Sequence, residues 1–142
     1  MRPDLLALAV VLAVTALFAL WWRARDGRVR NVDERFTRAE LDAVGAPPDA
    51  WTLLEISAPH CAPCVDARQV LDEVAAQRSD VVVRVADVDE QLELVRTHRV
   101  LRAPTVFVLE PLGAVRARVS GVPDVGELAA VLDSTLDTPA RL

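Results

Sequence analysis

The segment Ser57-Ala58-Pro59-His60-Cys61-Ala62-Pro63-Cys64 carries both cysteines of the 142-residue chain. The preceding residues, Trp51–Ser57, form an apolar run in which Glu55 is the one charged residue, and such a run predicts a buried strand. Beyond the segment, apolar residues recur at the spacing of one helix face, at Ala67, Val70, Leu71 and Val74. The two cysteines therefore stand where a strand gives way to a helix that starts at about Cys61.

This placement favours thiol–disulfide chemistry. The free backbone N–H groups and the dipole at a helix N-terminus stabilise a thiolate, here on Cys61. Cys64 follows within one helical turn, so the two sulfurs can close a disulfide. Pro63 suits the first turn, because its missing N–H has no partner there and its fixed φ is helical. The spacing predicts that Cys61 attacks and that Cys64 resolves.

Other uses of a cysteine pair fit less well. A structural disulfide that closes a four-residue loop removes little chain entropy. Haem attachment requires His directly after the second cysteine, where this chain has Val65. A metal site has only His60 and His98 to add to the two thiols, and a second C-x-x-C is absent. A carrier that handles copper or zinc through Cys61, Cys64 and His60 stays open as the alternative.

The N-terminal segment Leu5–Trp22 is uncharged over eighteen residues, which just reaches the length that spans a bilayer. No small-x-small cleavage pattern follows it, and the tandem Trp21-Trp22 before Arg23 is typical of an interfacial belt. The sequence therefore predicts a retained single-pass transmembrane anchor over residues 1–24, with membrane contact through residues 5–22, and not a cleaved signal peptide.

Arginine sets the expected orientation of this anchor. Four Arg follow the segment, and Arg2 alone precedes it; the four are Arg23, Arg25, Arg28 and Arg30. The positive-inside rule then favours a cytoplasmic domain, with an extracytoplasmic domain as the alternative. All sixteen basic residues of the chain are Arg, which indicates the coding bias of a high-GC bacterium.

Composition limits the rest of the chain to one domain. Residues 1–30 carry a net charge of +3, and residues 31–142 carry −8. An acidic domain lacks the positive footprint that a phosphate backbone needs, so no nucleic-acid partner is expected. Without the anchor, roughly 100 to 120 residues remain, which is enough for a single core and too few for two domains.

The polar, Arg-rich residues 25–36 are expected to form a juxtamembrane linker. The capping-box pattern Thr37-Arg38-Ala39-Glu40 then predicts a short helix that ends near Gly45. The further elements expected are a strand, a helix, a hairpin and a final helix: Val81–Val88, Glu90–His98, Thr105–Leu109 with Val115–Ser120 around Pro111-Leu112-Gly113, and Val125–Leu136. This order predicts an α/β fold, a mixed sheet with helices on both faces, before a tail at 139–142.

The cysteine segment after an apolar strand resembles the active-site segment of the thioredoxin superfamily. The resemblance continues through three further motifs: Val88-Asp89, Arg102-Ala103-Pro104-Thr105-Val106 and Gly121. It covers roughly residues 37–138, which are expected to form the thioredoxin-like domain. The whole chain resembles a membrane-anchored thioredoxin-like protein.

The resemblance implies roles for four residues in catalysis. Cys61 matches the nucleophile and Cys64 the resolving thiol. Pro104 matches the cis-proline that faces the disulfide. Glu55 matches the buried carboxylate behind the second cysteine, where burial raises its pKa and lets it move the proton of the resolving thiol. The other interpretation of Glu55 is that strand alternation turns it outward at a sheet edge.

The resemblance also implies a substrate-binding surface, made of residues around the disulfide: His60, Ala62, Pro63, Ala103 and Gly121. Ala103 would offer its backbone to a bound substrate chain. His60 replaces the usual Trp, and Ala62 replaces the Gly of Cys-Gly-Pro-Cys. His60 can tune the thiolate if it is protonated, or it is a solvated loop residue.

Other polar residues are expected to lie outside the site. His98 is predicted to be exposed at a helix end, where it would stabilise the helix dipole. Four acidic residues are predicted to form a solvated face: Asp87, Asp89, Glu90 and Glu93.

The expected function is that of a membrane-tethered thiol–disulfide oxidoreductase in cell redox homeostasis. It would act on protein thiols and disulfides and would need a redox-recycling partner. The expected cofactors are none beyond the redox-active disulfide Cys61–Cys64, and no metal is expected. A two-cysteine metal carrier would need neither a cis-proline nor a buried Glu, so these two features favour the enzyme.

Overall fold

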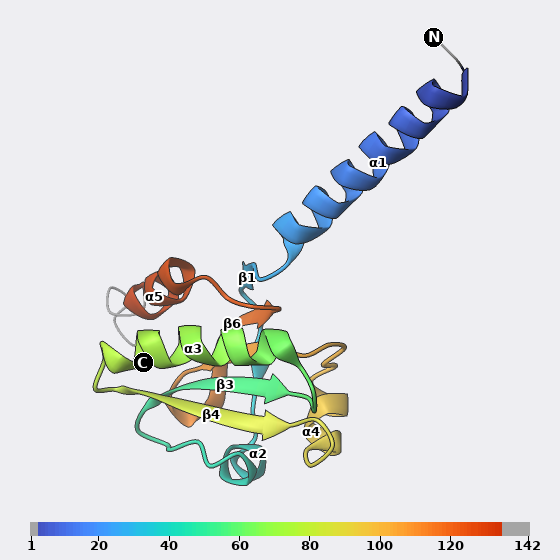
Figure 1. The fold of residues 1–142 in the computed structure, drawn as a ribbon. Helices are drawn as coiled ribbons and strands as arrows, with labels where there is room; N and C mark the ends of the chain where they lie inside the picture. The colour runs from blue at the N-terminus through green and yellow to red at the C-terminus, as the bar shows by residue number, and fades with distance from the viewer. Residues whose placement is uncertain (1–2, 135–142) are drawn as a thin grey trace.

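The computed structural model describes residues 3–134, and Figure 1 shows one helix projecting from a sheet that is covered by further helices. The projecting helix, α1, spans Pro3–Arg25 and has no buried residue. It is long and apolar enough to cross a membrane. Arg23 and Arg25 lie in its last turn, where cations are favourable to the helix dipole.

The sheet is mixed, as predicted, and the strand before the cysteines lies inside it. β3 (Trp51–Ser57) pairs in parallel with β4 (Val81–Asp87) and antiparallel with β5 (Thr105–Leu109). β5 in turn pairs antiparallel with β6 (Ala114–Ser120). The order across the sheet is β1-β6-β5-β3-β4, where β1 is the short strand Val29–Arg30. A short 3-10 helix, η1 (Pro111–Gly113), makes the turn between β5 and β6.

Helices cover both faces of the sheet (Figure 1). α3 (Ala62–Ala76) and α5 (Val125–Asp133) lie on one face, and α2 (Arg38–Ala43) and α4 (Leu92–Thr97) lie on the other. Each face has its own apolar cluster, because alternate residues of a strand point to opposite sides. The predicted fold class is confirmed.

The predicted bounds differ slightly from those observed. Trp51–Ser57 is a strand over the predicted residues, whereas the helix predicted at Glu90–His98 is only Leu92–Thr97. The capping box at Thr37 is present: Glu40 N donates to Thr37 Oγ1 at 3.3 Å, and Thr37 N donates to the Glu40 carboxylate at 2.7 Å. The predicted end of the last helix at Leu136, the domain end at 138 and the tail 139–142 lie outside the described residues.

Residues 25–36 differ from the expected linker. They hold two short strands, β1 (Val29–Arg30) and β2 (Glu34–Arg35), and both pair antiparallel with β6. Phe36, at the end of this stretch, is 1% exposed and belongs to the core. The stretch is therefore part of the domain, because β6 supplies backbone partners that its own sequence does not reveal.

His98 also differs from its prediction, since it is 3% exposed. Its Nδ1 lies 2.6 Å from Glu34 Oε1, and its Nε2 lies 3.1 Å from Glu40 Oε1. The ring stacks on Phe36, with centroids 3.9 Å apart. His98 does follow the last residue of α4, as predicted, but two carboxylates and an aromatic ring give it a buried site.

The carboxyl group of Glu40 shows the effect of this cluster. Burial raises its pKa, but the hydrogen bonds from Thr37 and the nearby His98 outweigh burial, so the pKa lies below its ordinary value. Glu40 therefore caps α2 and faces His98 at the same time. Of the predicted solvated acids, Asp89, Glu90 and Glu93 are exposed, and Asp87 is half-buried.

Candidate active site

The two cysteines lie at the start of α3, as the sequence predicted. Cys61 is the N-cap residue of this helix, and Cys64 lies in its first turn. A disulfide joins them, with their Cα atoms 5.3 Å apart. Cys64 is 2% exposed, whereas Cys61 is half-buried. Only Cys61 therefore offers its sulfur to another molecule.

The helix N-terminus acts directly on the Cys61 sulfur. The backbone N–H of Cys64 donates to Cys61 Sγ over 3.2 Å. Pro63 occupies the first turn, where it gives up no helical hydrogen bond. After reduction, the same N–H and the helix dipole would favour negative charge on Cys61.

Glu55 is fully buried in the central strand β3. Leu53, two residues earlier, packs in the same cluster as Leu71 of α3, so alternation directs Glu55 toward the same face. This arrangement excludes the outward-facing interpretation. Glu55 therefore lies beneath α3, the helix whose first turn holds Cys64.

The surroundings of the Glu55 carboxyl group disfavour its ionised form. Burial raises its pKa, and the Arg68 guanidinium offsets this increase only in part. Arg68 Nε donates to Glu55 Oε2 at 3.2 Å, while Oε1 is buried without a hydrogen-bond partner among the described residues. A buried carboxyl group with a raised pKa is suited to accept and return a proton.

Arg68 was not singled out in the sequence. It follows Cys64 by four residues on α3, a spacing that places two side chains on one face of a helix. That spacing was the available signal, but it has meaning only once Glu55 is known to lie under the same helix. The Arg68 side chain is 44% exposed, so solvent weakens its hold on Glu55.

The second part of the site is the loop before β5. The Ala103–Pro104 peptide bond is cis, as the resemblance implied. A groove of about 510 Å³ runs beside it, and its lining includes Pro63, Ala103, Pro104 and Gly121. Gly121 N donates to Pro104 O at 2.8 Å, which joins two residues of this lining. Four of the predicted site residues thus share one surface.

The remaining predicted residues, His60 and Ala62, flank Cys61 and are exposed. His60 has a φ of 56°, the left-handed region, and no hydrogen bond or ion pair joins it to another residue between 3 and 134. Its two interpretations, as a group that tunes the thiolate and as a solvated loop residue, both remain consistent with this position.

Residues from the end of α1 complete the groove and were not predicted. Trp22, Arg23 and Asp26 line it together with Arg102 and Val122. Asp26 and Arg102 form an ion pair that joins the end of α1 to the loop before Pro104. The signal available in the sequence was Asp26 itself, the one acid among the Arg that follow the apolar segment.

Metal ligation was the alternative use of the cysteines. Within residues 3–134, no three side chains of His, Cys, Asp or Glu gather in a way that could hold a metal ion. His98, which the sequence offered as a further ligand, contacts Glu34 and Glu40 instead.

Comparison with known sequences identifies related proteins. A family model described as thioredoxin matches residues 32–134. Thioredoxin H2-1 of Oryza sativa subsp. japonica is 37% identical over 82 residues, which are 58% of this chain and 58% of the rice protein. The chain thus spans little more than half the length of that relative.

Comparison with solved structures supports the fold. A malarial protein matches with a TM-score of 0.55 and 20% identity, over 61% of this chain and 98% of its own. A structure described as thioredoxin-2, a component of the malaria parasite protein secretion machinery, matches with a TM-score of 0.54 and 20% identity, over 60% and 82% of the two chains.

The buried position of Glu55 predicts a pH-dependent gain in stability for Glu55→Gln. Because the pKa of Glu55 is raised, the wild-type fold is favoured at low pH and loses stability as pH rises through that pKa. Gln carries no charge, so the variant should be more stable than the wild type at pH 8 by about 1–3 kcal/mol. Urea unfolding of the oxidised chain in neutral detergent, between pH 4 and pH 8, measures the difference.

The matched control is Glu93→Gln, which neutralises a side chain that is 92% exposed and should change little at any pH. A gain at Glu55 that does not grow from pH 4 to pH 8, or a loss at pH 8, would contradict the buried, raised-pKa carboxyl group.

Proposed function

Since the chain belongs to the thioredoxin family, we propose that it is a thiol–disulfide oxidoreductase that works through Cys61-Ala62-Pro63-Cys64. The observation that carries the proposal is the disulfide at the N-terminus of α3, with one sulfur accessible and the other buried. A short disulfide at a helix start contributes little to stability and is well placed for exchange.

In the proposed reaction, the reduced protein begins with Cys61 as a thiolate. Its sulfur attacks one sulfur of a substrate disulfide, so a Cys61–substrate bond forms and the substrate S–S bond breaks. The first substrate thiolate leaves and takes a proton. Cys64 then attacks Cys61 Sγ, which forms the Cys61–Cys64 disulfide and releases the second substrate thiolate. Two electrons pass from the protein dithiol to the substrate.

Glu55 serves the second step in this proposal. Cys64 must lose its proton before it attacks, and it is 2% exposed, which keeps bulk water away. Glu55 is the buried carboxylate under the same helix, so we assign it the role of proton acceptor, directly or through a water. Arg68 positions Glu55 and limits the rise of its pKa.

The groove beside Pro104 is the proposed substrate site. The Ala103 backbone borders it and can hydrogen-bond to an extended substrate chain next to the reacting disulfide. Pro63 and Gly121 form other parts of its lining, and Gly121 leaves room there because it has no side chain. Protein thiols and disulfides are therefore the proposed substrates, and a further redox protein would restore the starting state of the cysteines.

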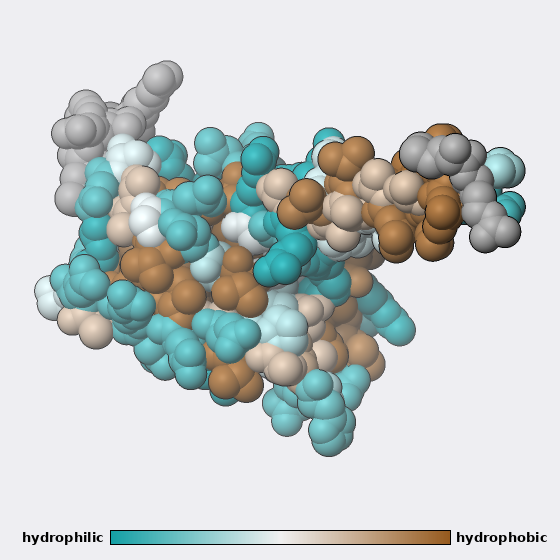
Figure 2. Space-filling view, turned by 45° about the horizontal axis from the view of Figure 1, so that its top comes forward, coloured by the Kyte–Doolittle hydropathy of each residue, from teal (hydrophilic) through white to brown (hydrophobic). Residues whose placement is uncertain are grey.

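We also propose that α1 anchors the protein in a membrane as a single pass. Its 23 residues measure about 35 Å, slightly more than the hydrocarbon thickness of a bilayer. Apolar side chains cover the visible face of α1 in Figure 2, and hydrophilic ones gather where it meets the domain. The Arg residues in the last turn of α1 and directly after it favour the cytoplasmic side for the domain.

The assigned roles predict different trapping by the two cysteine variants. Cys64→Ser should accumulate mixed disulfides with cellular proteins, because Cys61 still attacks and nothing resolves the product. Cys61→Ser should accumulate none, because Cys64 is buried. Non-reducing gels of alkylated cell extracts, probed for the full chain, measure the adducts. Equal trapping by the two variants, or none by either, would refute the assignment.

The proposed orientation predicts protection of the domain in intact spheroplasts. Protease added outside should leave a C-terminal tag untouched until the membrane is opened with detergent. A periplasmic protein of the same cells serves as the control for protease access, and a cytoplasmic one reports sealing. Loss of the tag while the cytoplasmic control survives would place the domain on the outer side.

A further inference from the structure

A second pocket lies between the end of α1 and the β1–β6 edge of the sheet, next to the groove of the redox site. Its volume is about 510 Å³. Five of its lining residues are Arg, and the one acid among them is Asp26: the Arg are Arg25, Arg28, Arg30, Arg102 and Arg118. This concentration of cations stands out because residues 31–142 carry a net charge of −8.

Two of the five Arg are already engaged. Arg102 forms the ion pair with Asp26. Arg118 donates to His98 O at 2.7 Å and to Arg99 O at 2.9 Å. Arg118 Nη1 also lies 3.9 Å from Glu34 Oε2. These two side chains are therefore held in place, and nearby carboxylates offset part of their charge.

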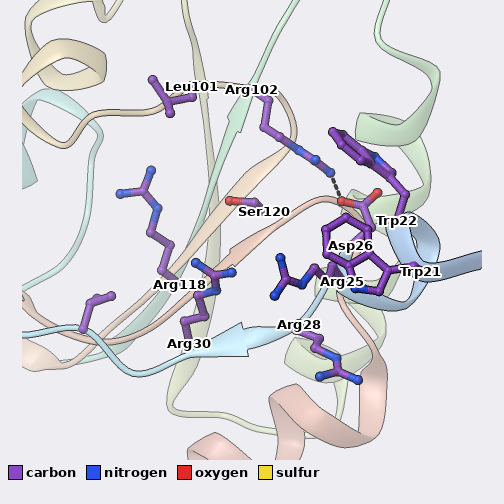
Figure 3. Close-up of a pocket in the computed structure, with 11 residues that line it drawn as sticks. Trp21, Trp22, Arg25, Asp26, Arg28, Arg30, Leu101, Arg102, Arg118 and Ser120 are labelled. Atoms are coloured by element: carbon purple, nitrogen blue, oxygen red, sulfur yellow. Dashed lines mark ion pairs between the residues drawn. The ribbon is translucent and has the colours of Figure 1, made fainter. Parts of the chain in front are cut away.

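The other three Arg have no carboxylate partner among the described residues. Arg25 lies over the ring of Trp21, 4.4 Å from its centroid. Arg30 lies opposite Arg118 in the β1–β6 register, and like charges in that position destabilise a strand pair. In Figure 3, the side chains of Arg25 and Arg30 extend into the space between them, while Arg28 projects from the segment that joins them. Excess positive charge in this pocket favours the binding of an anion.

The pattern differs on other parts of the surface. Arg38, Arg96 and Arg116 each lie within 4 Å of a carboxylate oxygen, at 3.1, 3.6 and 3.8 Å respectively. Arg35 and Arg84 have no carboxylate partner within residues 3–134 either, but each donates to a backbone carbonyl. The pocket differs because three Arg without such a partner line one cavity together.

Exposed apolar side chains border the pocket. Trp21 and Trp22 are 50% and 55% exposed, and Leu101 is 92% exposed. Trp21 and Trp22 lie near the end of the apolar helix α1, and Leu101 lines the pocket from the loop before β5. Trp and Arg at the end of a spanning helix occupy the headgroup level of a bilayer. The lining of the pocket therefore fits a site that opens at a membrane surface.

We propose that this pocket binds the phosphate group of an anionic phospholipid headgroup. Guanidinium groups bind phosphate oxygens in pairs, and the volume is in the range of small-molecule sites. A zwitterionic headgroup would bring a cation to the Arg cluster, so an anionic lipid is preferred. The proposal rests on the membrane anchoring proposed above and is independent of the redox chemistry.

Headgroup binding would also hold the redox site at the membrane. Asp26 and Arg102 line both the Arg pocket and the groove beside Pro104. A phospholipid held on one side of this ion pair keeps the groove on the other side close to the headgroups. The geometry then favours substrate thiols that lie near the membrane surface.

Lipid selectivity of the full chain in nanodiscs tests the proposal. Spin-labelled phosphatidylglycerol and spin-labelled phosphatidylcholine report which lipid associates with the protein. The wild type should prefer phosphatidylglycerol by at least about fivefold, the factor for one Arg contact at an anionic surface. R25Q/R28Q/R30Q should bring the preference close to one. R38Q/R96Q/R116Q removes the same charge elsewhere and should keep the wild-type preference.

Three outcomes would overturn the proposal. Equal preference in the wild type and in R25Q/R28Q/R30Q, with both inserted in the discs, would exclude a headgroup site and leave the anchoring intact. Loss of the preference on addition of inorganic phosphate, compared with chloride at the same ionic strength, would assign the pocket to free phosphate. Failure of the wild type to insert would refute the anchoring and this proposal together, while trapping by Cys61 would still test the redox function separately.

Discussion

The packing of α3 over β3 is the interaction on which the site depends. It buries Cys64, in the first turn of α3, and Glu55, in the strand beneath, and it leaves Cys61 half-buried at the helix N-terminus. One structural contact thus sets the different exposures of the two cysteines. The core beneath it, with Leu53 and Leu71, holds the helix at a fixed height above the strand. In the proposed reaction, this difference in exposure assigns attack and resolution to different sulfurs.

Two features of the protein reduce its stability, and the proposed functions give a reason for each. Glu55 carries a buried carboxyl group with an unpartnered oxygen in a strand that would otherwise be apolar. In the neighbouring Arg pocket, Arg30 lies opposite Arg118 in a short strand pair. Groups that destabilise a fold are often found where they bind or react. In the proposed function the first would serve proton transfer at Cys64, and in the proposed lipid site the second would serve anion binding.

Much of the fold could be predicted, because its signals are local in the sequence. The strand Trp51–Ser57, the capping box at Thr37 and the C-x-x-C at a helix start each depend on a few adjacent residues. The errors depend on contacts between distant residues. Two-residue strands such as β1 are too short to show a periodic pattern. His98 is buried because it contacts Glu34 and Phe36, which lie more than sixty residues earlier in the sequence. Arg68 and the Asp26–Arg102 pair could not be predicted either, because their partners are distant in the sequence.

The central claim is that the Cys61–Cys64 disulfide is a working redox bond and not a structural one. Its equilibrium with glutathione and dithiothreitol buffers tests this most directly, with the dithiol fraction of the full chain measured by mass after alkylation. The account predicts one two-electron transition between about −120 and −270 mV, the range of thiol–disulfide oxidoreductases. A pair that stays oxidised to below about −300 mV would behave as a structural disulfide and would contradict the claim.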